Sequence, residues 1–461
     1  MLYTSVNKGP MEGNIMKTYD LTQGDLSAHL VRLAIPLMLG NILQQLYNTI
    51  DAMVVGRYAG GLEFAAIGVS SSVMNLFIFI VVGACTGISV LFSQQYGARD
   101  LETFRRQHFL TLVFGLLAAA VMSLASIFLL PALLKVIQTP EEILSYTKTY
   151  LVIVLASLPA SFLYNLYSAL LRSVGSTRAA LAVLASAVVI NLILDLVLVA
   201  GFHLGIAGAA WATAAAQFFS AALCILYLRL ARPELLFNRA DCRMDGPLLR
   251  RTAHFSFVTA LHQSGLYIGK LLVQGAVNSM GTDLISAYTA TTRIEAFANS
   301  IGDSSASATS VLIAQNLGAN RKDRAQQGMR RAMLIFGSLG LFSGALMFLF
   351  APQASALLLG AGSGVAFENS CAYLRTVSLF YILCFTGSTF VGYFDGRGNV
   401  SIPLVGACSH ISMRAALSWL WIRRLKLPAV ALGTGIGWVW VNLFWTLCYF
   451  YLQRKQEKVK N

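Results

Sequence analysis

Four polar side chains interrupt an apolar stretch near the N-terminus, residues 29–57 (HLVRLAIPLMLGNILQQLYNTIDAMVVGR). Spacings of three, four and three place them on one stripe of a helix: Asn41, Gln44, Asn48 and Asp51. The stretch is long enough to cross a bilayer, where an ionised carboxylate that faces lipid is costly. We therefore predict that the stripe faces a protein interior or a water-filled cavity, and that Asp51 belongs to a functional site. The alternative is a buried carboxyl group that only joins helices.

A second polar pair, Asn191 and Asp195, lies in another apolar stretch, residues 179–201. The spacing of four places both side chains on one face of a helix, which is again expected to avoid lipid. We predict that this pair shares a cavity with Asp51. Two carboxyl groups that are close together and removed from water favour binding a proton. Such chemistry suits ion-coupled transport; the alternative is an intramembrane enzyme that uses the two groups as acid and base.

Composition indicates which elements must position these residues. Of the 461 residues, 56% are hydrophobic and only 12% are charged, and the mean hydropathy is +0.66. Soluble domains have about a quarter charged residues, so this composition predicts an all-α, polytopic membrane protein. The net charge of +14 comes from basic residues in short loops between apolar runs, which disfavours a nucleic-acid partner.

Twelve transmembrane spans are expected from apolar runs of about 20 residues. They centre on residues 30–56, 64–93, 108–130, 146–170, 179–201, 205–228, 253–279, 284–315, 332–351, 368–392, 401–422 and 429–452. A basic segment interrupts them and divides the chain into a tail (1–25), a six-helix lobe (26–228), a linker (229–251), a second six-helix lobe (252–452) and a second tail (453–461).

The distribution of basic residues predicts the orientation. With a cytoplasmic N-terminus, the inner loops and tails hold 24 Lys and Arg residues and the outer loops hold six. Because basic loops stay on the cytoplasmic side, both termini and the linker are expected there. The outer cluster Arg423, Arg424 and Lys426 is an exception that the pattern does not explain.

The two halves of the chain repeat each other. Residues 93–99 (SQQYGAR) match 314–320 (AQNLGAN) at a displacement of 221, and 171–175 (LRSVG) match 394–398 (FDGRG). Gly208-x-x-Trp211 also matches Gly435-x-x-Trp438. Two six-span repeats of equal orientation should be related by an axis along the membrane normal. A two-lobed bundle of this kind is typical of transporters.

These motifs, with the stretch AIPLMLGNILQQLYNTIDAMVVG, the turn LRSVGST and the run NLILD, resemble the multidrug and toxic compound extrusion (MATE) family, most closely its DinF-like branch. The resemblance extends from Leu26 to Tyr451. It implies a V-shaped twelve-helix secondary transporter that exports substrates, often cationic and lipophilic, in exchange for protons or sodium. It also implies that Asp51, Asn191 and Asp195 form the proton or cation site of the N-terminal lobe. Further neighbours in that cavity, with ordinary helix packing as the equal alternative, are Gln44, Asn48, Asn165 and Thr213, with a bend at Pro36 that we expect to change during transport.

The second half lacks the acids of the first. The counterpart of Asp51 is Leu272 and that of Asp195 is Ser418, and Gly265 and Cys384 stand where other members of the family carry acids on the seventh and tenth spans. A sodium site of that second kind is therefore disfavoured. The eighth span carries its own polar cluster, formed by Arg293, Glu295, Asn299 and Asp303. We interpret it first as a salt-bridge network in which Arg293 and Arg375 are the basic partners. The second interpretation is a contact with substrate.

The sequence as a whole favours a secondary-active exporter of organic, cationic or amphipathic compounds that is coupled to protons. Sodium coupling is the main alternative, and a lipid-linked saccharide flippase or an aspartyl enzyme is less favoured. No phosphate-binding loop or metal-ligand spacing occurs, so no catalytic residue, metal or cofactor is expected beyond the coupling ion. The expected partners are a small-molecule substrate and membrane lipid, with the chain acting as a monomer.

Overall fold

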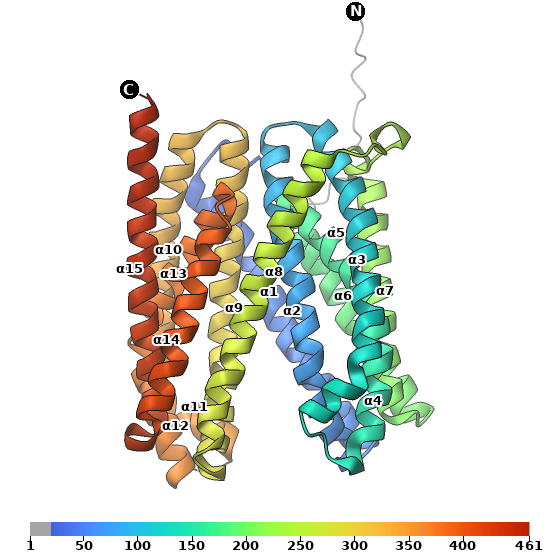
Figure 1. Ribbon diagram of the computed structural model, residues 1–461, viewed down its shortest axis with the longest axis vertical. Coiled ribbons are helices and arrows are strands. Elements are labelled where there is room, and N and C mark those ends of the chain that lie inside the picture. The colour runs from blue at the N-terminus through green and yellow to red at the C-terminus, as the bar shows by residue number, and fades with distance from the viewer. Residues whose placement is uncertain (1–19, 361, 461) are drawn as a thin grey trace, which may run out of the picture.

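The computed structural model describes residues 20–360 and 362–460, without the side chains of Asn48, Ala52 and residues 456–460. In these residues the chain forms helices and no strand (Figure 1). The α-helices of the first half are α1 (Leu26–Tyr58), α2 (Gly61–Gly97), α3 (Leu101–Val136), α4 (Glu141–Ala156), α5 (Leu158–Ser173), α6 (Thr177–Asp195) and α7 (Gly205–Ala231). Those of the second half are α8 (Gly246–Asn278), α9 (Thr282–Gly318), α10 (Lys322–Leu349), α11 (Ala351–Leu359), α12 (Val365–Ser378), α13 (Tyr381–Arg397), α14 (Ser401–Leu425) and α15 (Leu427–Lys460).

These helices make twelve spans. The pairs α4–α5 and α12–α13 are single spans bent by 46° and 53°, and α11 is a short extra helix. Length and composition alone identify seven of the described helices as membrane-spanning, or nine with the bent pairs. The other three, α8, α9 and α14, are 33, 37 and 25 residues long and carry more polar residues, several of them buried. The predicted all-α bundle of twelve spans in two lobes is confirmed.

The repeat is visible in the backbone. Helices α2 and α9 both have 37 residues, start 221 positions apart and follow glycines with positive φ, Gly60 at 112° and Gly281 at 93°. Both are followed by a left-handed residue, Arg99 and Asn320, each with φ of 58°. Glycine adopts the left-handed region without steric cost, whereas Arg and Asn are held there by the turn. The sequence match at 93–99 and 314–320 therefore reflects a conformational repeat.

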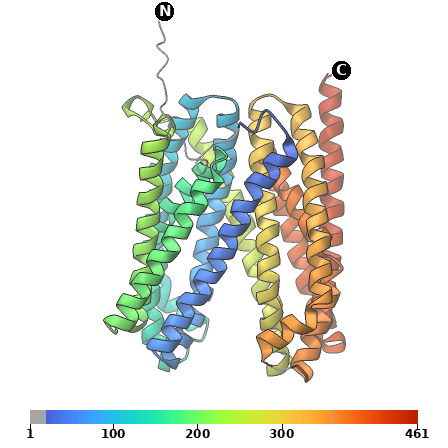
Figure 2. The same ribbon diagram turned by 180° about the vertical axis from the view of Figure 1, so that it is seen from behind.

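The first helix of each repeat crosses from one lobe to the other. Leu30 and Leu33, near the start of α1, pack in one cluster with Leu312 of α9 and Phe336 of α10. Figure 2 shows α1, in deep blue, running from this lobe down to the side of α6. In the same way Phe255 at the start of α8 packs with residues of α2. The lobes are thus joined by two crossing helices as well as by the linker.

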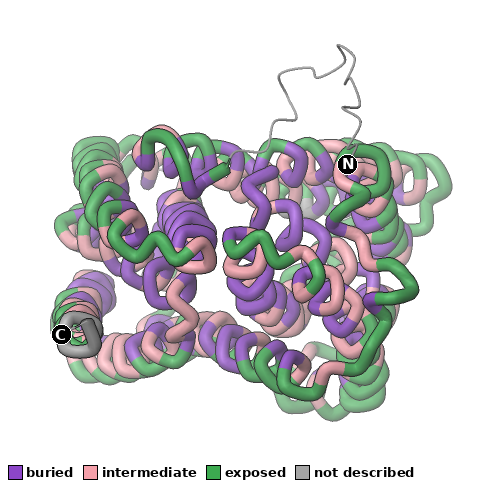
Figure 3. The backbone as a smooth tube through the Cα atoms, turned by 90° about the horizontal axis from the view of Figure 1, so that it is seen from above, coloured by how far each residue is buried: buried purple, intermediate pink, exposed green. Residues whose placement is uncertain are grey.

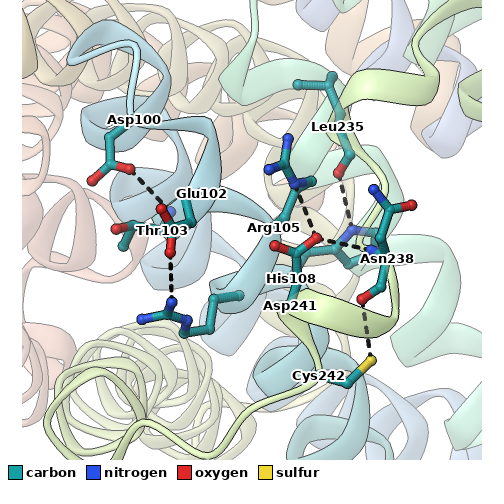
Figure 4. A network of polar contacts seen from close by, with 10 residues as sticks. Asp100, Glu102, Thr103, Arg105, His108, Leu235, Asn238, Asp241 and Cys242 are labelled. Atoms are coloured by element: carbon teal, nitrogen blue, oxygen red, sulfur yellow. Dashed lines mark hydrogen bonds and ion pairs between the residues drawn. The ribbon is translucent and has the colours of Figure 1, made fainter.

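Polar contacts fix the segment that precedes each crossing helix. Before α8, Arg105 of α3 forms an ion pair with Asp241 at 3.0 Å, and His108 Nδ1 lies 3.3 Å from the carbonyl of Leu235 (Figure 4). Before α1, the Arg321 guanidinium donates to the carbonyl of Thr22 at 2.8 Å. The segment before α8 is therefore bound to the N-terminal lobe, and the segment before α1 is bound to the C-terminal lobe.

Burial follows the two lobes. Viewed along the bundle, buried residues face the interior of each lobe and exposed residues form the perimeter (Figure 3). The perimeter is apolar: Phe128, Leu357 and Leu447 are 83%, 83% and 71% exposed. An apolar exterior of this extent fits lipid rather than water. The start of α1, the end of α15 and the linker lie at one end of the bundle, and the lobes spread apart toward the other end (Figures 1 and 2). The cytoplasmic location of the tails and linker stays a prediction.

Candidate functional site

The carboxyl groups of Asp51 and Asp195 contact each other inside the N-terminal lobe. Asp51 lies in the second half of α1, Asp195 is the last residue of α6, and the two side chains are within hydrogen-bonding distance. They are 8% and 0% exposed. A hydrogen bond between two carboxyl groups requires a proton on one of them, so this arrangement is suited to binding a proton between two helices.

Neighbouring polar groups orient the pair. The Asn191 amide, placed so that both of its ends find partners, donates to Asp195 Oδ2 at 2.9 Å and accepts from the backbone N–H of Thr213 at 3.3 Å. The Tyr47 hydroxyl donates to Thr213 Oγ1 at 3.3 Å. Oδ1 of Asp51 and Oδ1 of Asp195 are both buried, and neither accepts a hydrogen bond from an N–H or O–H donor among the described residues. The pair therefore has acceptor capacity left for a water molecule or a cation.

The backbone changes its helical form directly after Asp195. Residues Leu196–Gly201 form a short π-helix, in which the N–H of Phe202 donates to the carbonyl of Val197 at 2.8 Å. His203 then takes a left-handed conformation with φ of 53° before α7 begins. Single π-turns inside α-helices occur frequently at functional sites. The sequence predicted an ordinary helix over 179–201 and gave no sign of this turn.

The other predicted cavity residues are distributed around the pair. Gln44 lines a pocket between α1, α5, α6 and α7, together with Tyr47, Tyr164 and Gln217. Asn165 instead donates to the Ser161 carbonyl of its own helix at 2.8 Å. Pro36 is buried in α1, which continues through it, and the side chain of Asn48 lies outside the described residues.

Two tyrosines near the site were not found from the sequence. Tyr47 precedes Asp51 by one helical turn, a spacing that would have placed it on the same stripe, but aromatic residues on an apolar helix give no polar signal. Tyr150 of α4 is 2% exposed and lies close enough to Thr213 for a hydrogen bond. Tyr150 and Asp51 lie on different helices, so no sequence spacing connects them, and only the packing of α4 in the lobe reveals that Tyr150 is near the site.

The polar cluster on α9 has hydroxyl partners, and the predicted salt-bridge network is wrong. Glu295 is 6% exposed and accepts hydrogen bonds from the hydroxyls of Tyr373 at 2.8 Å and Tyr381 at 3.4 Å. Within the described residues no ion pair joins Glu295 or Asp303 to Arg293 or Arg375. Two positions along a helix correspond to about 200° of rotation, so Arg293 points away from Glu295 and is exposed.

The remaining members of this cluster have separate contacts. The Asn299 amide oxygen accepts a weak hydrogen bond from Cys384 Sγ at 3.7 Å, and Asp303 is exposed. Arg375 lies over the Phe348 ring, 5.8 Å from its centroid. Arg414, which stands at the position equivalent to Asn191, donates to the Tyr288 hydroxyl at 3.5 Å. In the described residues no group of three or more His, Cys, Asp or Glu side chains is arranged to hold a metal ion.

Comparisons with known proteins agree with this architecture. The model of the MatE family matches residues 36–197 and 259–420, one segment in each repeat. The probable multidrug resistance protein YpnP of Bacillus subtilis is 26% identical, over 96% of this chain and 99% of its own. DNA damage-inducible protein F of Escherichia coli is 25% identical, over 57% and 56%. A solved structure of MATE in the bent conformation superposes with a TM-score of 0.89 at 21% identity and covers 96% of this chain and all of its own.

Proposed function

The chain belongs to the MatE family of membrane transporters, and on that premise we propose that it exports organic, cationic or amphipathic compounds in exchange for protons. It is a multi-pass membrane transporter and not an enzyme. The names of its relatives as multidrug resistance proteins support the substrate class. We place both tails and the linker in the cytoplasm, so the lobes would spread apart on the outer side. The working unit in this proposal is a single copy of the chain, surrounded by lipid.

The contact between Asp51 and Asp195 is the observation that supports proton coupling. With one proton shared, the pair carries one negative charge and draws α1 toward α6. Loss of that proton leaves two carboxylates that repel each other in a site with little water, and this favours a cationic substrate between them. A second proton neutralises the pair and weakens its hold on the cation. Different affinities of proton and substrate for the two states of the cavity are sufficient for exchange.

Gradient-driven export from proteoliposomes tests the ion. A fluorescent lipophilic cation such as ethidium serves as the probe, and either a pH gradient or a sodium gradient is imposed. We expect export to follow the pH gradient and to be lost in Asp195→Asn and in Asp51→Asn. Ser418→Ala is the matched control, because Ser418 is the repeat equivalent of Asp195, is fully buried and donates only to the Arg414 carbonyl of its own helix. Export that follows sodium and ignores pH would overturn proton coupling in favour of the sodium alternative.

Labelling from outside intact cells tests the orientation. Ala240 is exposed in the linker, and so is the native Cys242, which is first replaced by serine. A cysteine at position 240 is expected to react with a membrane-impermeant maleimide only after the membrane is opened. Labelling in intact cells would contradict the predicted topology.

A further inference from the structure

The repeated sequence motif at residues 93–99 and 314–320 is not part of the site described above. It forms the ends of α2 and α9, where the two lobes meet at the end of the bundle that carries the tails. Each copy contains a glutamine followed three residues later by a glycine: Gln94 with Gly97, and Gln315 with Gly318. A glutamine in this position has an amide group that can both donate and accept.

Each glutamine donates to the end of a helix in the other lobe. Gln315 Nε2 of α9 lies 2.6 Å from the carbonyl oxygen of Ser173 in the last turn of α5. Gln94 Nε2 of α2 lies 3.1 Å from the carbonyl oxygen of Gly396 in the last turn of α13. Ser173 and Gly396 are themselves equivalent in the repeat, at the third positions of LRSVG and FDGRG. The two hydrogen bonds are therefore one contact made twice, in opposite directions across the lobes.

The accepting carbonyls need such a donor. The last carbonyls of a helix have no intrahelical partner, and a buried carbonyl without a partner is costly. Ser173 and Gly396 are buried, and Gln315 is 1% exposed. When the lobes are together at this end, each lobe thus completes the hydrogen bonding of a helix terminus in the other.

The glycines bring the two helices close enough for these contacts. A Cβ atom on Gly97 would lie 2.1 Å from the carbonyl oxygen of Gln315, and one on Gly318 would lie 2.0 Å from that of Gln94. Backbone occupies the space of any side chain at either position, so a larger residue would force α2 and α9 apart. The amide of Gln94 is also oriented by Arg251 of α8, whose guanidinium donates to Gln94 Oε1 at 2.8 Å.

We propose that Gln94 and Gln315 are a pair of positioning residues that hold this end of the transport path closed and release it together. Because both bonds cross the same interface, separation of the lobes breaks them in one step and exposes two helix ends to water. The interface is then either closed with both bonds made or open with neither. This proposal concerns the gate alone and does not depend on which ion or substrate is carried.

Distances between spin labels on the two lobes test the proposal. Labels at Glu102 of α3 and Asp323 of α10, both exposed at this end, report the separation in protein whose native cysteines are replaced by alanine and which still exports the probe. We expect Gln315→Leu and Gln94→Leu each to raise the ratio of open to closed molecules by about fivefold, the scale of one lost hydrogen bond. Gly318→Ala should raise it further.

Gln95→Leu is the matched control. Gln95 is the neighbour of Gln94 and equally half-buried, but its amide donates within its own lobe, to Gln107 Oε1 at 3.5 Å. It should leave the distances unchanged. If Gln315→Leu does not fold, Gln94→Leu at the half-buried equivalent position decides. Unchanged distances in folded Gln94→Leu protein, or an equal shift in Gln95→Leu, would overturn the proposal, whatever the result of the proton-coupling test.

Discussion

Helix α6 with its π-turn and helix α14 occupy equivalent places in the two lobes, and they differ at the positions of the proposed coupling residues. Both run for 25 residues, Thr177–Gly201 and Ser401–Leu425. The first carries Asn191 and Asp195 and leaves the α-helical form directly after the acid. The second carries Arg414 and Ser418 at those positions and stays α-helical to its end. The same backbone plan thus supports a carboxyl pair in one lobe only.

The buried carboxyl group of Glu295 and those of the Asp51–Asp195 pair also differ in how completely they are hydrogen-bonded. Both oxygens of Glu295 accept from tyrosine hydroxyls, whereas Asp51 and Asp195 each keep a buried oxygen without a partner among the described residues. A fully bonded buried group stabilises the packing of its neighbours and gains nothing from an added ion. A partly bonded one remains able to bind. Burial alone therefore does not distinguish the proposed coupling pair from Glu295, whereas unused acceptor oxygens do.

The largest expected effect comes from exchanging the chemistry of the two helices. Asp195→Ser should lower gradient-driven export by about 100-fold, the scale of a strong coupling free energy. Adding Ser418→Asp should not restore it, because the new carboxylate would lie one turn from Arg414 and far from Asp51. Proteoliposome export rates measure both variants. Recovery of export in the double variant would show that a carboxyl group in either lobe can support export, contrary to the proposed difference between the lobes.

Equivalent tyrosines should differ in their contribution to stability. Tyr373→Phe removes a hydroxyl that donates to Glu295 at 2.8 Å and leaves a buried carboxyl oxygen without that donor, so it should lower the free energy of unfolding by about 2 kcal/mol. Tyr150 is the repeat equivalent and faces Thr213, a neutral partner, so Tyr150→Phe should cost about 1 kcal/mol or less. Thermal unfolding of both variants in the same detergent gives the two values. A larger loss of unfolding free energy for Tyr150→Phe than for Tyr373→Phe would contradict this expectation.

Glu295→Gln should be mild. The amide keeps the shape of the side chain and one acceptor oxygen for the tyrosine hydroxyls, so export should fall by about threefold at most, the scale of one weakened hydrogen bond. Asp51→Asn, measured in the same assay, should abolish it. Equal losses in the two variants would mean that the lobes share the coupling chemistry.

The smallest effect concerns the segments that precede the crossing helices. Partial burial alone would raise the pKa of Asp20, but hydrogen bonds from the Thr22 hydroxyl and N–H, with Arg99 and Arg321 nearby, hold it below its ordinary value. A lowered pKa adds stability above the ordinary pKa of Asp, and this contribution is lost as pH falls through the lowered value. Asp20→Asn should therefore slightly lower the unfolding temperature at pH 7, and this difference should shrink as the pH falls below the ordinary pKa of Asp. A difference that grows toward low pH would contradict this.

Much of the molecule was determined by the sequence alone. Hydrophobic runs of bilayer length predicted the twelve spans, and the matches at 93–99 and 171–175 predicted the repeat. The same reasoning brought Asp51, Asn191 and Asp195 together, since polar residues in a membrane helix must turn away from lipid and toward one another. These are local properties: they depend on the length and polarity of one segment at a time, so they can be read without knowing its neighbours.

Only the tertiary structure decided which segments meet. It shows that α1 and α8 cross between the lobes, that Glu295 is bonded to tyrosines of α12 and α13 instead of arginines, and that Gln315 reaches a carbonyl 142 residues away. It also shows the π-turn after Asp195. Each of these depends on the direction of a side chain about its helix axis and on which helix lies beside it. Polar groups inside a bundle have several possible partners of similar strength, and the packing of whole helices selects among them.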